Sequence, residues 1–214
     1  MEIIHIDDAL LVVNKPAGLP VLPDGWEPSA PYLVKLLEDE YGKCWVVHRL
    51  DKITSGVLLF ARDSDTHRKL NRLFETREVH KTYHAIINGL PGWDEHDARH
   101  SLRVNVGHTH RTVVDHRRGK SSQTVFHILE RFTKHCLLEA HPLSGRTHQV
   151  RVHAYALGFP LLGDILYSAP PTDLIARPAL HALSMEFNFE GNLLHFEAPY
   201  PLDFSEAIKR PRAG

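Results

Sequence analysis

The chain has 214 residues, of which 43% are hydrophobic and 24% are charged, a composition typical of globular proteins. Uninterrupted apolar runs such as Ala9 to Val13 are far shorter than the roughly 20 residues that span a bilayer, so no association with a membrane is expected. The 25 Lys and Arg residues against 26 Asp and Glu residues give a net charge of −1, which excludes the overall basic character of many nucleic-acid-binding proteins. Affinity for any anionic partner must then come from local groups of cations.

The N-terminal residues lack both the basic start and the apolar stretch of a signal peptide, which favours a cytoplasmic location. No repeat, low-complexity tract or Pro/Gly/Ser-rich linker divides the chain, so we expect a single domain over residues 1–214. The two cysteines, Cys44 and Cys136, form no CxxC pair. We interpret them as buried thiols rather than as a disulfide or as part of a zinc site.

Short apolar runs bounded by Gly, Pro or Asp predict a protein rich in strands. In chain order the predicted strands are Glu2 to Ile6, Leu10 to Asn14, Val57 to Arg62, Lys81 to Asn88, Gln123 to Arg131 and Cys136 to His141. Two further runs, at 182–189 and 193–197, flank Glu190-Gly191-Asn192, a spacing that predicts a hairpin.

Three helices are predicted from apolar residues that share one helix face. They are a helix capped by Ser29 that carries Leu33, Leu36 and Leu37 and ends at Gly42, a helix capped by Ser64 that carries Leu70, Leu73 and Phe74, and a helix that carries Val150, Ala154 and Leu157 and ends at Gly158. The irregular order of strands and helices, together with the hairpin, predicts an α+β fold with a mixed, largely antiparallel sheet flanked by helices.

The stretch 48–56, with the sequence HRLDKITSG, places cations, a carboxylate, hydroxyls and a glycine between apolar runs. Gly56 permits a sharp bend, and the cations Arg49 and Lys52 favour the ionised form of the Asp51 carboxylate. An ionised carboxylate can act as a nucleophile or as a base. On local chemistry alone, the favoured hypothesis is the simpler one, that Asp51 stabilises its loop through backbone hydrogen bonds.

The same stretch resembles the HRLDxxTSG signature of the RluA-type RNA pseudouridine synthases, and the other motifs of that family occur in the expected order. They are Asn14-Lys15-Pro16-Ala17-Gly18 (NKPxG), Lys81-Thr82-Tyr83-His84-Ala85 (KxYxA), residues 145–153 with the sequence GRTHQVRVH (GRTHQxRVH), Gly163-Asp164 with Tyr167, and Leu180-His181-Ala182 (LHA). The similarity spans residues 2 to 200, so chance agreement does not explain it. It implies the catalytic fold of pseudouridine synthases and the isomerisation of uridine in RNA.

The resemblance also implies roles for individual residues. Asp51 matches the essential aspartate, which attacks the ribose or removes a sugar proton while the uracil is detached, turned and reattached through carbon. Arg151 matches the arginine that pairs with this aspartate, and a helix-surface charge is its simpler alternative. Tyr83 matches the aromatic residue beneath the target base, and a core strand residue is its simpler alternative. Arg49 matches the arginine that fills the space left by the flipped nucleotide.

The remaining expectations concern partners. Lys15, Lys81 and Arg146 lie in matched motifs and are expected to contact the RNA backbone, with ordinary surface positions as the alternative. The expected substrate is a uridine in a loop of ribosomal or transfer RNA, without a cofactor, a metal or an obligate protein partner. Because the catalytic pattern already begins at Glu2, no separate N-terminal RNA-binding domain is expected. The polar, histidine-rich stretch 91–122 is a candidate for substrate choice, or else an exposed connection.

Three other functions compete with this interpretation. A metal-dependent hydrolase would use His108 and His110, or His148 and His153, as ligands, but no diagnostic spacing such as HExxH occurs. A noncatalytic RNA-binding module would keep the fold without the chemistry, and the presence of all three catalytic candidates argues against it. A glycosidase would need a second acidic residue to complete the usual pair, and no matched motif supplies one.

Overall fold

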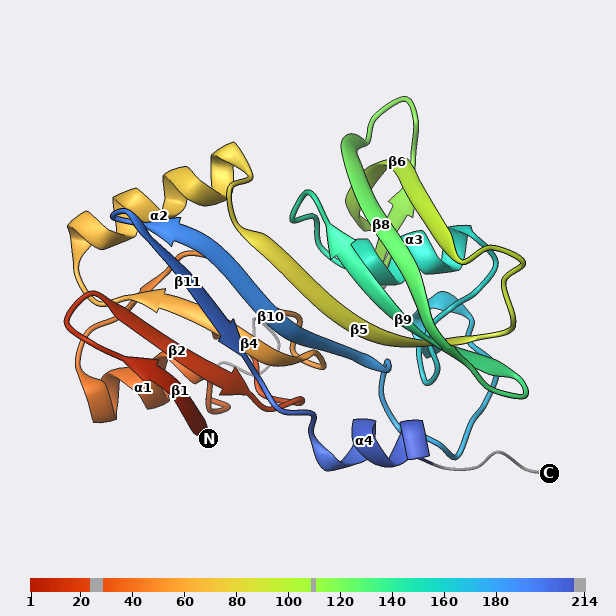
Figure 1. The fold of residues 1–214 in the computed structure, drawn as a ribbon, viewed down its shortest axis with the longest axis horizontal. Coiled ribbons are helices and arrows are strands. Elements are labelled where there is room, and N and C mark those ends of the chain that lie inside the picture. The colour runs from red at the N-terminus through yellow and green to blue at the C-terminus, as the bar shows by residue number, and fades with distance from the viewer. Residues whose placement is uncertain (24–28, 109–110, 210–214) are drawn as a thin grey trace. The chain divides into compact units, whose positions relative to one another are not determined.

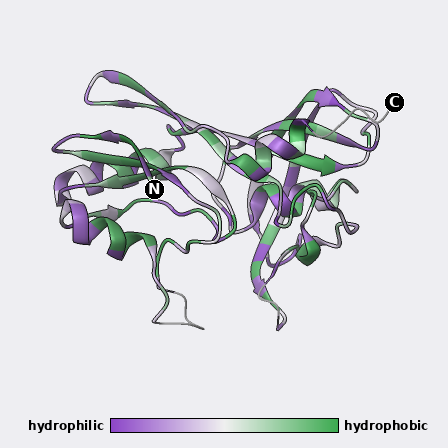
Figure 2. Cartoon of the chain, turned by 90° about the horizontal axis from the view of Figure 1, so that it is seen from below, coloured by the Kyte–Doolittle hydropathy of each residue, from purple (hydrophilic) through white to green (hydrophobic). Residues whose placement is uncertain are grey.

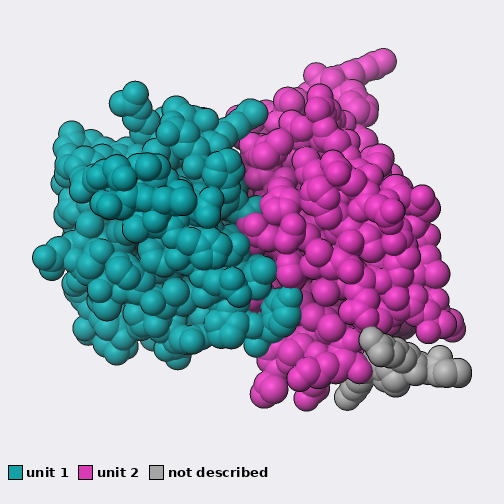
Figure 3. All heavy atoms as spheres, in the orientation of Figure 1, with its two compact units in different colours: residues 1–81, 182–200 teal, residues 82–181, 201–214 magenta. Residues whose placement is uncertain are grey.

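The computed structural model describes residues 1–23, 29–108 and 111–209. The chain forms two compact units, coloured separately in Figure 3: the first comprises residues 1–81 and 182–200, and the second comprises residues 82–181 and 201–214. Each unit combines strands with helices, so the predicted α+β class is confirmed. The expected single domain over residues 1–214 stays a prediction, because compactness of the two units does not show whether either of them folds alone.

The first unit is built on a sheet in which neighbouring strands are far apart in the sequence. Its strands are β1 (Glu2–Ile6), β2 (Leu10–Lys15), β3 (Trp45–Val46), β4 (Ser55–Ala61), β10 (Leu180–Phe189) and β11 (Asn192–Glu197). Neighbours follow the order β1-β2-β4-β10, with β3 paired to β4 and β11 paired to β10. The β1–β2, β2–β4, β3–β4 and β10–β11 pairs are antiparallel. Figure 1 shows β10 running in the same direction as β4, which makes the sheet mixed, as predicted.

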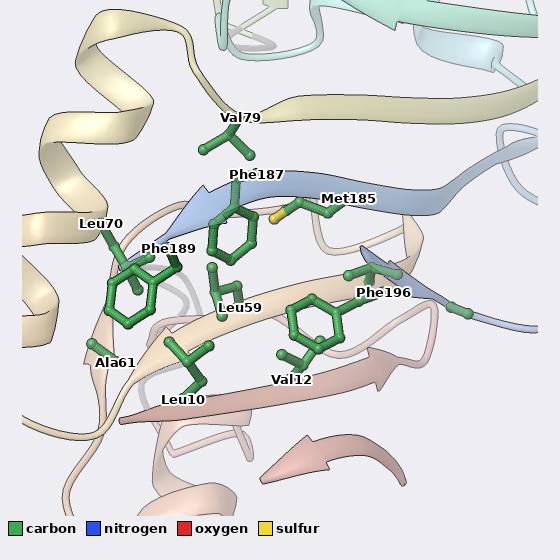
Figure 4. Packing of buried hydrophobic residues seen from close by; sticks show 12 residues of the cluster. Leu10, Val12, Leu59, Ala61, Leu70, Val79, Met185, Phe187, Phe189 and Phe196 are labelled. Atoms are coloured by element: carbon green, nitrogen blue, oxygen red, sulfur yellow. The ribbon is translucent and has the colours of Figure 1, made fainter. Parts of the chain in front are cut away.

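Two helices accompany this sheet, α1 (Leu33–Tyr41) and α2 (Ser64–Thr76). Strand β4 is buried along its whole length, so it reads as a continuous apolar run instead of an alternating one. Figure 4 shows Leu70 of α2 reaching the phenylalanine and leucine side chains of β4 and β10, with Leu10 and Val12 of β2 in the same cluster. This core supports β4, the strand that follows the Asp51 loop directly.

The predicted start of the first helix is wrong. Helix α1 begins at Leu33 after Tyr32, not after Ser29, and Leu36 is 43% exposed instead of inward. The N–H groups of Leu33 and Val34 donate to the carbonyls of Pro20 and Val21, so backbone of a neighbouring segment does the work of a side-chain cap. Its end at Gly42 is confirmed, since Gly42 has the positive φ that a glycine accommodates.

The second unit contains an antiparallel sheet of the order β5-β9-β8-β6-β7. Its elements are β5 (His80–Asn88), β6 (Glu95–Val106), β7 (Arg111–Val114), β8 (Lys120–Arg131), β9 (His135–Pro142), α3 (Gln149–Ala156), the 3-10 turn η1 (Ile165–Tyr167) and α4 (Leu202–Lys209). Val150 and Ala154 of α3 pack with Phe126 and Leu138 of the sheet, which confirms the predicted apolar face of this helix. The first two residues of β5 belong to the first unit, and the first two of β10 belong to the second.

The stretch 91–122 is not an irregular connection, since it contains all of β6 and β7 and the first residues of β8. Only Ala98 and Leu102 of β6 are buried, because a strand with one solvated face needs few apolar residues. Because these strands are mostly polar, the search for short apolar runs did not predict them. The C-terminal hairpin is confirmed: Glu190 and Gly191 both have positive φ, and Phe189 pairs with Asn192 across the two-residue turn.

Cys44 and Cys136 are both buried, as predicted, and neither forms a disulfide. Figure 2 shows hydrophilic and hydrophobic residues interleaved along the chain, and no helix in the described part is long and apolar enough to cross a membrane.

Candidate active site

The loop that carries Asp51 joins β3 to β4, and His48 anchors it near its start. The His48 Nε2 atom accepts a hydrogen bond from the Leu59 N–H at 3.1 Å, and its ring stacks on Phe74 with 4.8 Å between centroids. Burial, together with the charge of Lys81, lowers the pKa of His48 to about 3. His48 is thus a neutral imidazole with its proton on Nδ1, a structural role that the motif did not reveal.

Lys15 holds the loop beside Asp51. Its side chain is completely buried, and its Nζ donates to the carbonyls of Pro16, Leu19 and Lys52 at 2.8, 2.7 and 3.1 Å. The Gly18 N–H also donates to the Lys52 carbonyl at 2.8 Å. This burial argues against the direct RNA contact expected for Lys15, because all three ammonium protons are used inside the protein.

Gly56 is required where β4 begins. Its φ is +117°, and a Cβ atom there would lie 2.1 Å from the carbonyl oxygen of Ala182 in β10. Only glycine allows this approach of two strands directly after the Asp51 loop. The glycine of the HRLDxxTSG signature and the alanine of the LHA motif therefore meet in the structure.

The other predicted residues of the first unit differ in exposure. Asp51 is half-buried and Arg49 is exposed. Lys81, at the start of β5, is half-buried, and desolvation lowers its pKa to about 8. At neutral pH a fraction of the Lys81 side chains is therefore uncharged, which weakens it as a phosphate contact relative to Arg49.

Tyr83 and Arg151 lie in the second unit. Tyr83 of β5 is half-buried and stands opposite Ala140 of β9, on the sheet face that packs against α3. Arg151 lies on α3 and is 2% exposed, so the alternative of a helix-surface charge is wrong. Asp51 belongs to the first unit, and its pairing with Arg151 stays a prediction.

The buried guanidinium of Arg151 has a carboxylate partner that the sequence did not identify. Its Nε and Nη2 atoms donate to Oδ2 and Oδ1 of Asp164 at 2.7 and 2.8 Å, and Asp164 is completely buried. A buried arginine requires such a counter-charge. The aspartate of the Gly163-Asp164 motif was the sequence feature from which this partner could have been predicted.

Tyr167 also contacts Arg151. Its ring centroid lies 5.1 Å from the guanidinium carbon, within range of a cation–π contact. Its hydroxyl donates to the Thr112 carbonyl at 3.0 Å and accepts the Thr112 N–H at 3.1 Å. His148 Nδ1 is also 3.1 Å from this hydroxyl. Because the hydroxyl proton is already donated to the Thr112 carbonyl, Nδ1 carries the imidazole proton and donates to the second lone pair of the hydroxyl.

Two of the remaining candidates, Arg146 and His153, lie just before α3 and within it. Arg146 is half-buried, and its N–H donates to Gln149 Oε1 at 3.1 Å. His153 bonds Ser122 and Thr124 at 3.0 and 2.9 Å. Among residues 1–23, 29–108 and 111–209, no three His, Cys, Asp or Glu side chains are grouped to hold a metal ion. His110 lies outside the described residues.

Comparison with known proteins identifies the family. Residues 9–156 match the family described as RNA pseudouridylate synthase. The chain belongs to this family. It is 34% identical over 203 residues to the dual-specificity RNA pseudouridine synthase RluA of Pasteurella multocida, covering 93% of each chain. It is 35% identical over 233 residues to the ribosomal large subunit pseudouridine synthase D of Haemophilus ducreyi, covering 98% of this chain and 70% of that protein.

A solved structure agrees with this assignment. Human RNA pseudouridylate synthase domain containing 4 superposes with a TM-score of 0.81 at 26% identity, covering 98% of this chain and 92% of that one. The predicted RluA-type family and pseudouridine synthase fold are therefore confirmed. The chain is an RNA pseudouridine synthase, an isomerase that acts on RNA.

Proposed function

We propose that this pseudouridine synthase modifies a uridine in a loop of ribosomal or transfer RNA, with Asp51 as the catalytic carboxylate. Arg151 pairs with this carboxylate and orients it, and Tyr83 stacks beneath the target base. In the reaction the bond between ribose C1′ and uracil N1 breaks and a bond between C1′ and C5 forms. N1 takes up a proton and C5 releases one, so the reaction needs no oxidant, reductant or hydrolysis.

The observation that carries the proposal is the way in which the Asp51 loop is held. The carbonyl of Lys52, the next residue, receives hydrogen bonds from Lys15 Nζ and from the Gly18 N–H. His48 anchors the start of the loop on β4. Backbone on both sides of Asp51 is thus fixed by groups other than its own carboxylate, as electrostatic preorganisation of a reacting group requires.

RNA contacts are assigned by exposure and charge. Arg49, two residues before Asp51, is exposed. Its exposure supports the proposed role of its side chain in filling the space left by the flipped nucleotide. Arg146 and Lys81 are half-buried and are proposed as contacts to backbone phosphates. Lys15 acts through the loop that it holds and not through RNA.

The substrate class rests on the relatives. One is named as dual-specific and another as acting on the ribosomal large subunit. The second name supports large-subunit ribosomal RNA as the first substrate to test. Transfer RNA is the second substrate to test, because the resemblance to the RluA-type synthases implies it. A cytoplasmic location stays a prediction.

The test maps pseudouridine by carbodiimide labelling and primer extension. Unmodified transcripts of large-subunit ribosomal RNA and of transfer RNAs are incubated with the purified protein, without added metal or nucleotide. We expect new stops with the wild type, and Asp51→Asn should lower the rate by on the order of 1,000-fold or more, since it removes the reacting group. Asp39→Asn, which changes an exposed carboxylate on α1, should leave the rate unchanged.

The outcomes separate the alternatives. Stops that persist in Asp51→Asn would disprove the role of Asp51. Binding of the transcripts without any stop would favour a noncatalytic RNA-binding protein. Stops in only one RNA class would define the specificity of this chain.

A further inference from the structure

The guanidinium of Arg151 is held along one edge by Asp164. The two donor–acceptor distances of 2.7 and 2.8 Å join Nε and Nη2 to the two carboxylate oxygens, a fork that fixes the plane of the guanidinium. Both side chains are buried, at 2% and 0% exposure, so solvent does not loosen the pair. Nη1 is the guanidinium nitrogen that is not part of this fork.

Asp164 is itself held by backbone contacts. Its N–H donates to the Leu161 carbonyl at 3.1 Å, and the neighbouring Leu162 N–H donates to the Ile86 carbonyl at 2.8 Å. Ile86 belongs to β5, the strand that carries Tyr83. The carboxylate that orients Arg151 is therefore tied to the strand of the proposed base-stacking tyrosine.

Gly163 allows Asp164 to take this position. Its φ is +72°, and a Cβ atom there would lie 2.3 Å from the Arg177 carbonyl oxygen and 2.9 Å from that of Ile175. Any side chain would push the turn away from the segment on which it packs. The Gly163-Asp164 motif thus has a physical reason: the glycine permits the close approach and the aspartate receives the arginine.

Tyr167 restrains the face of the same guanidinium. Its ring lies 5.1 Å from the guanidinium carbon, and its hydroxyl is locked by both backbone groups of Thr112. Arg151 is therefore restrained along one edge by a carboxylate and over one face by a ring. A buried arginine that served packing alone would need only a counter-charge, not an orientation fixed in two directions.

We propose that Asp164 is a positioning residue for the isomerisation, which acts by fixing the orientation of the Arg151 guanidinium. This inference rests on the proposed function of Arg151 as the partner of the catalytic carboxylate. Asp164 is completely buried, so we expect it to affect the chemical step and not the binding of the substrate.

The test measures tritium release from transcripts labelled at uracil C5, because C5 loses its hydrogen when it joins the ribose. Single-turnover rates give the rate of the chemical step, and their dependence on protein concentration gives the affinity. Asp164→Asn should lower the rate roughly 100-fold, with affinity changed less than about 3-fold, because a small misplacement of an orienting group has effects of this size.

Two further variants keep the test decisive if Asp164→Asn folds poorly. Asp164→Glu keeps the charge of the buried pair but displaces the guanidinium by one methylene, and its rate should fall roughly 10-fold or more. Arg151→Met/Asp164→Asn removes both charges, which a buried pair tolerates better than the loss of one partner. Its rate should equal that of Arg151→Met alone, since Asp164 acts only through Arg151.

Asp203→Asn is the matched control. Asp203 forms the same fork with Arg177, at 2.7 and 3.0 Å, in the same unit but nearer the surface, and its loss should not change the rate. Wild-type rates in Asp164→Glu, or multiplicative effects in the double variant, would overturn the positioning role. No tritium release by the wild type would instead overturn the proposed function. Wild-type rates in Arg151→Met would overturn the premise that Arg151 orients the catalytic carboxylate. Either result would also overturn the inference about Asp164.

Discussion

Two buried cations, Lys15 and Arg151, show how single residues of the motifs work. Lys15 donates its three N–H groups to backbone carbonyls, and Arg151 donates to the Asp164 carboxylate. Removing a charged group from water costs several kcal/mol unless such partners are supplied. Both residues therefore have partners inside the protein. For Lys15 this argues against the expected contact with RNA, and for Arg151 it excludes the alternative of a helix-surface charge.

The buried histidines predict how stability depends on pH. Burial lowers the pKa of His153 to about 4, with a further contribution from the charge of His100. The folded-state pKa lies below the usual 6.5, so the unfolded chain binds more protons between pH 4 and 6.5. The stabilisation is fully present above pH 6.5 and is lost as the pH falls towards 4.

We expect His153 to contribute a loss of about 2 kcal/mol in the free energy of unfolding between pH 7 and pH 5, measured by urea denaturation. His48, whose pKa falls to about 3, should contribute a similar loss. His153→Gln should remove its share of the pH dependence. An unchanged pH dependence in His153→Gln would contradict this account.

At the scale of elements, the helix ends were the least predictable part. The pattern of apolar residues placed α2 correctly, but its N-cap is Asp63 and not Ser64. Asp63 Oδ1 accepts the N–H groups of Asp65 and Thr66 at 2.8 and 3.0 Å. Adjacent Asp and Ser residues are both good caps, and only the backbone conformation decides between them.

Separate alanine substitutions of Asp63 and Ser64 test which residue caps α2. Asp63→Ala should lower Tm by about 2–4 °C, because two helix N–H groups lose their acceptor. Ser64→Ala should change Tm by less than half of that, since Ser64 is the first helical residue and alanine is a good helix former. Tm is measured by circular dichroism. A larger decrease in Tm for Ser64→Ala than for Asp63→Ala would show that Ser64 is the N-cap.

At the scale of the molecule, a net charge of −1 means that overall charge does not draw the protein to RNA. Affinity must come from local contacts between cations and phosphates, each of which releases counterions. For the three proposed cations Arg49, Lys81 and Arg146, the dissociation constant should rise roughly 20- to 40-fold between 50 and 200 mM salt.

Filter binding of a transcript at increasing potassium chloride measures this slope. Sucrose at matched osmolality serves as the control and should leave the affinity unchanged. Affinity that is independent of salt would show that RNA is held by base contacts alone and would remove the phosphate role from these cations.

Much of this protein follows from its sequence alone. Strand β1, the third helix and the C-terminal hairpin agree with prediction because local apolar periodicity and turn residues determine such elements. The family and the identity of Asp51, Tyr83 and Arg151 as candidates follow from short motifs whose chemistry is local. The polar strands β6 and β7 escaped prediction because only a few of their residues face the core.

The tertiary structure decided which partner each charged group has. Asp164 lies 13 residues from Arg151 and Lys52 lies 37 residues from Lys15, so no local pattern relates them. Burial then determines the protonation state, as for neutral His48, and commits Lys15 to backbone carbonyls. Sequence motifs therefore supplied the candidates for the reacting residues, whereas packing decided which partners Lys15 and Arg151 have, because the cost of burying a charge depends on what surrounds it.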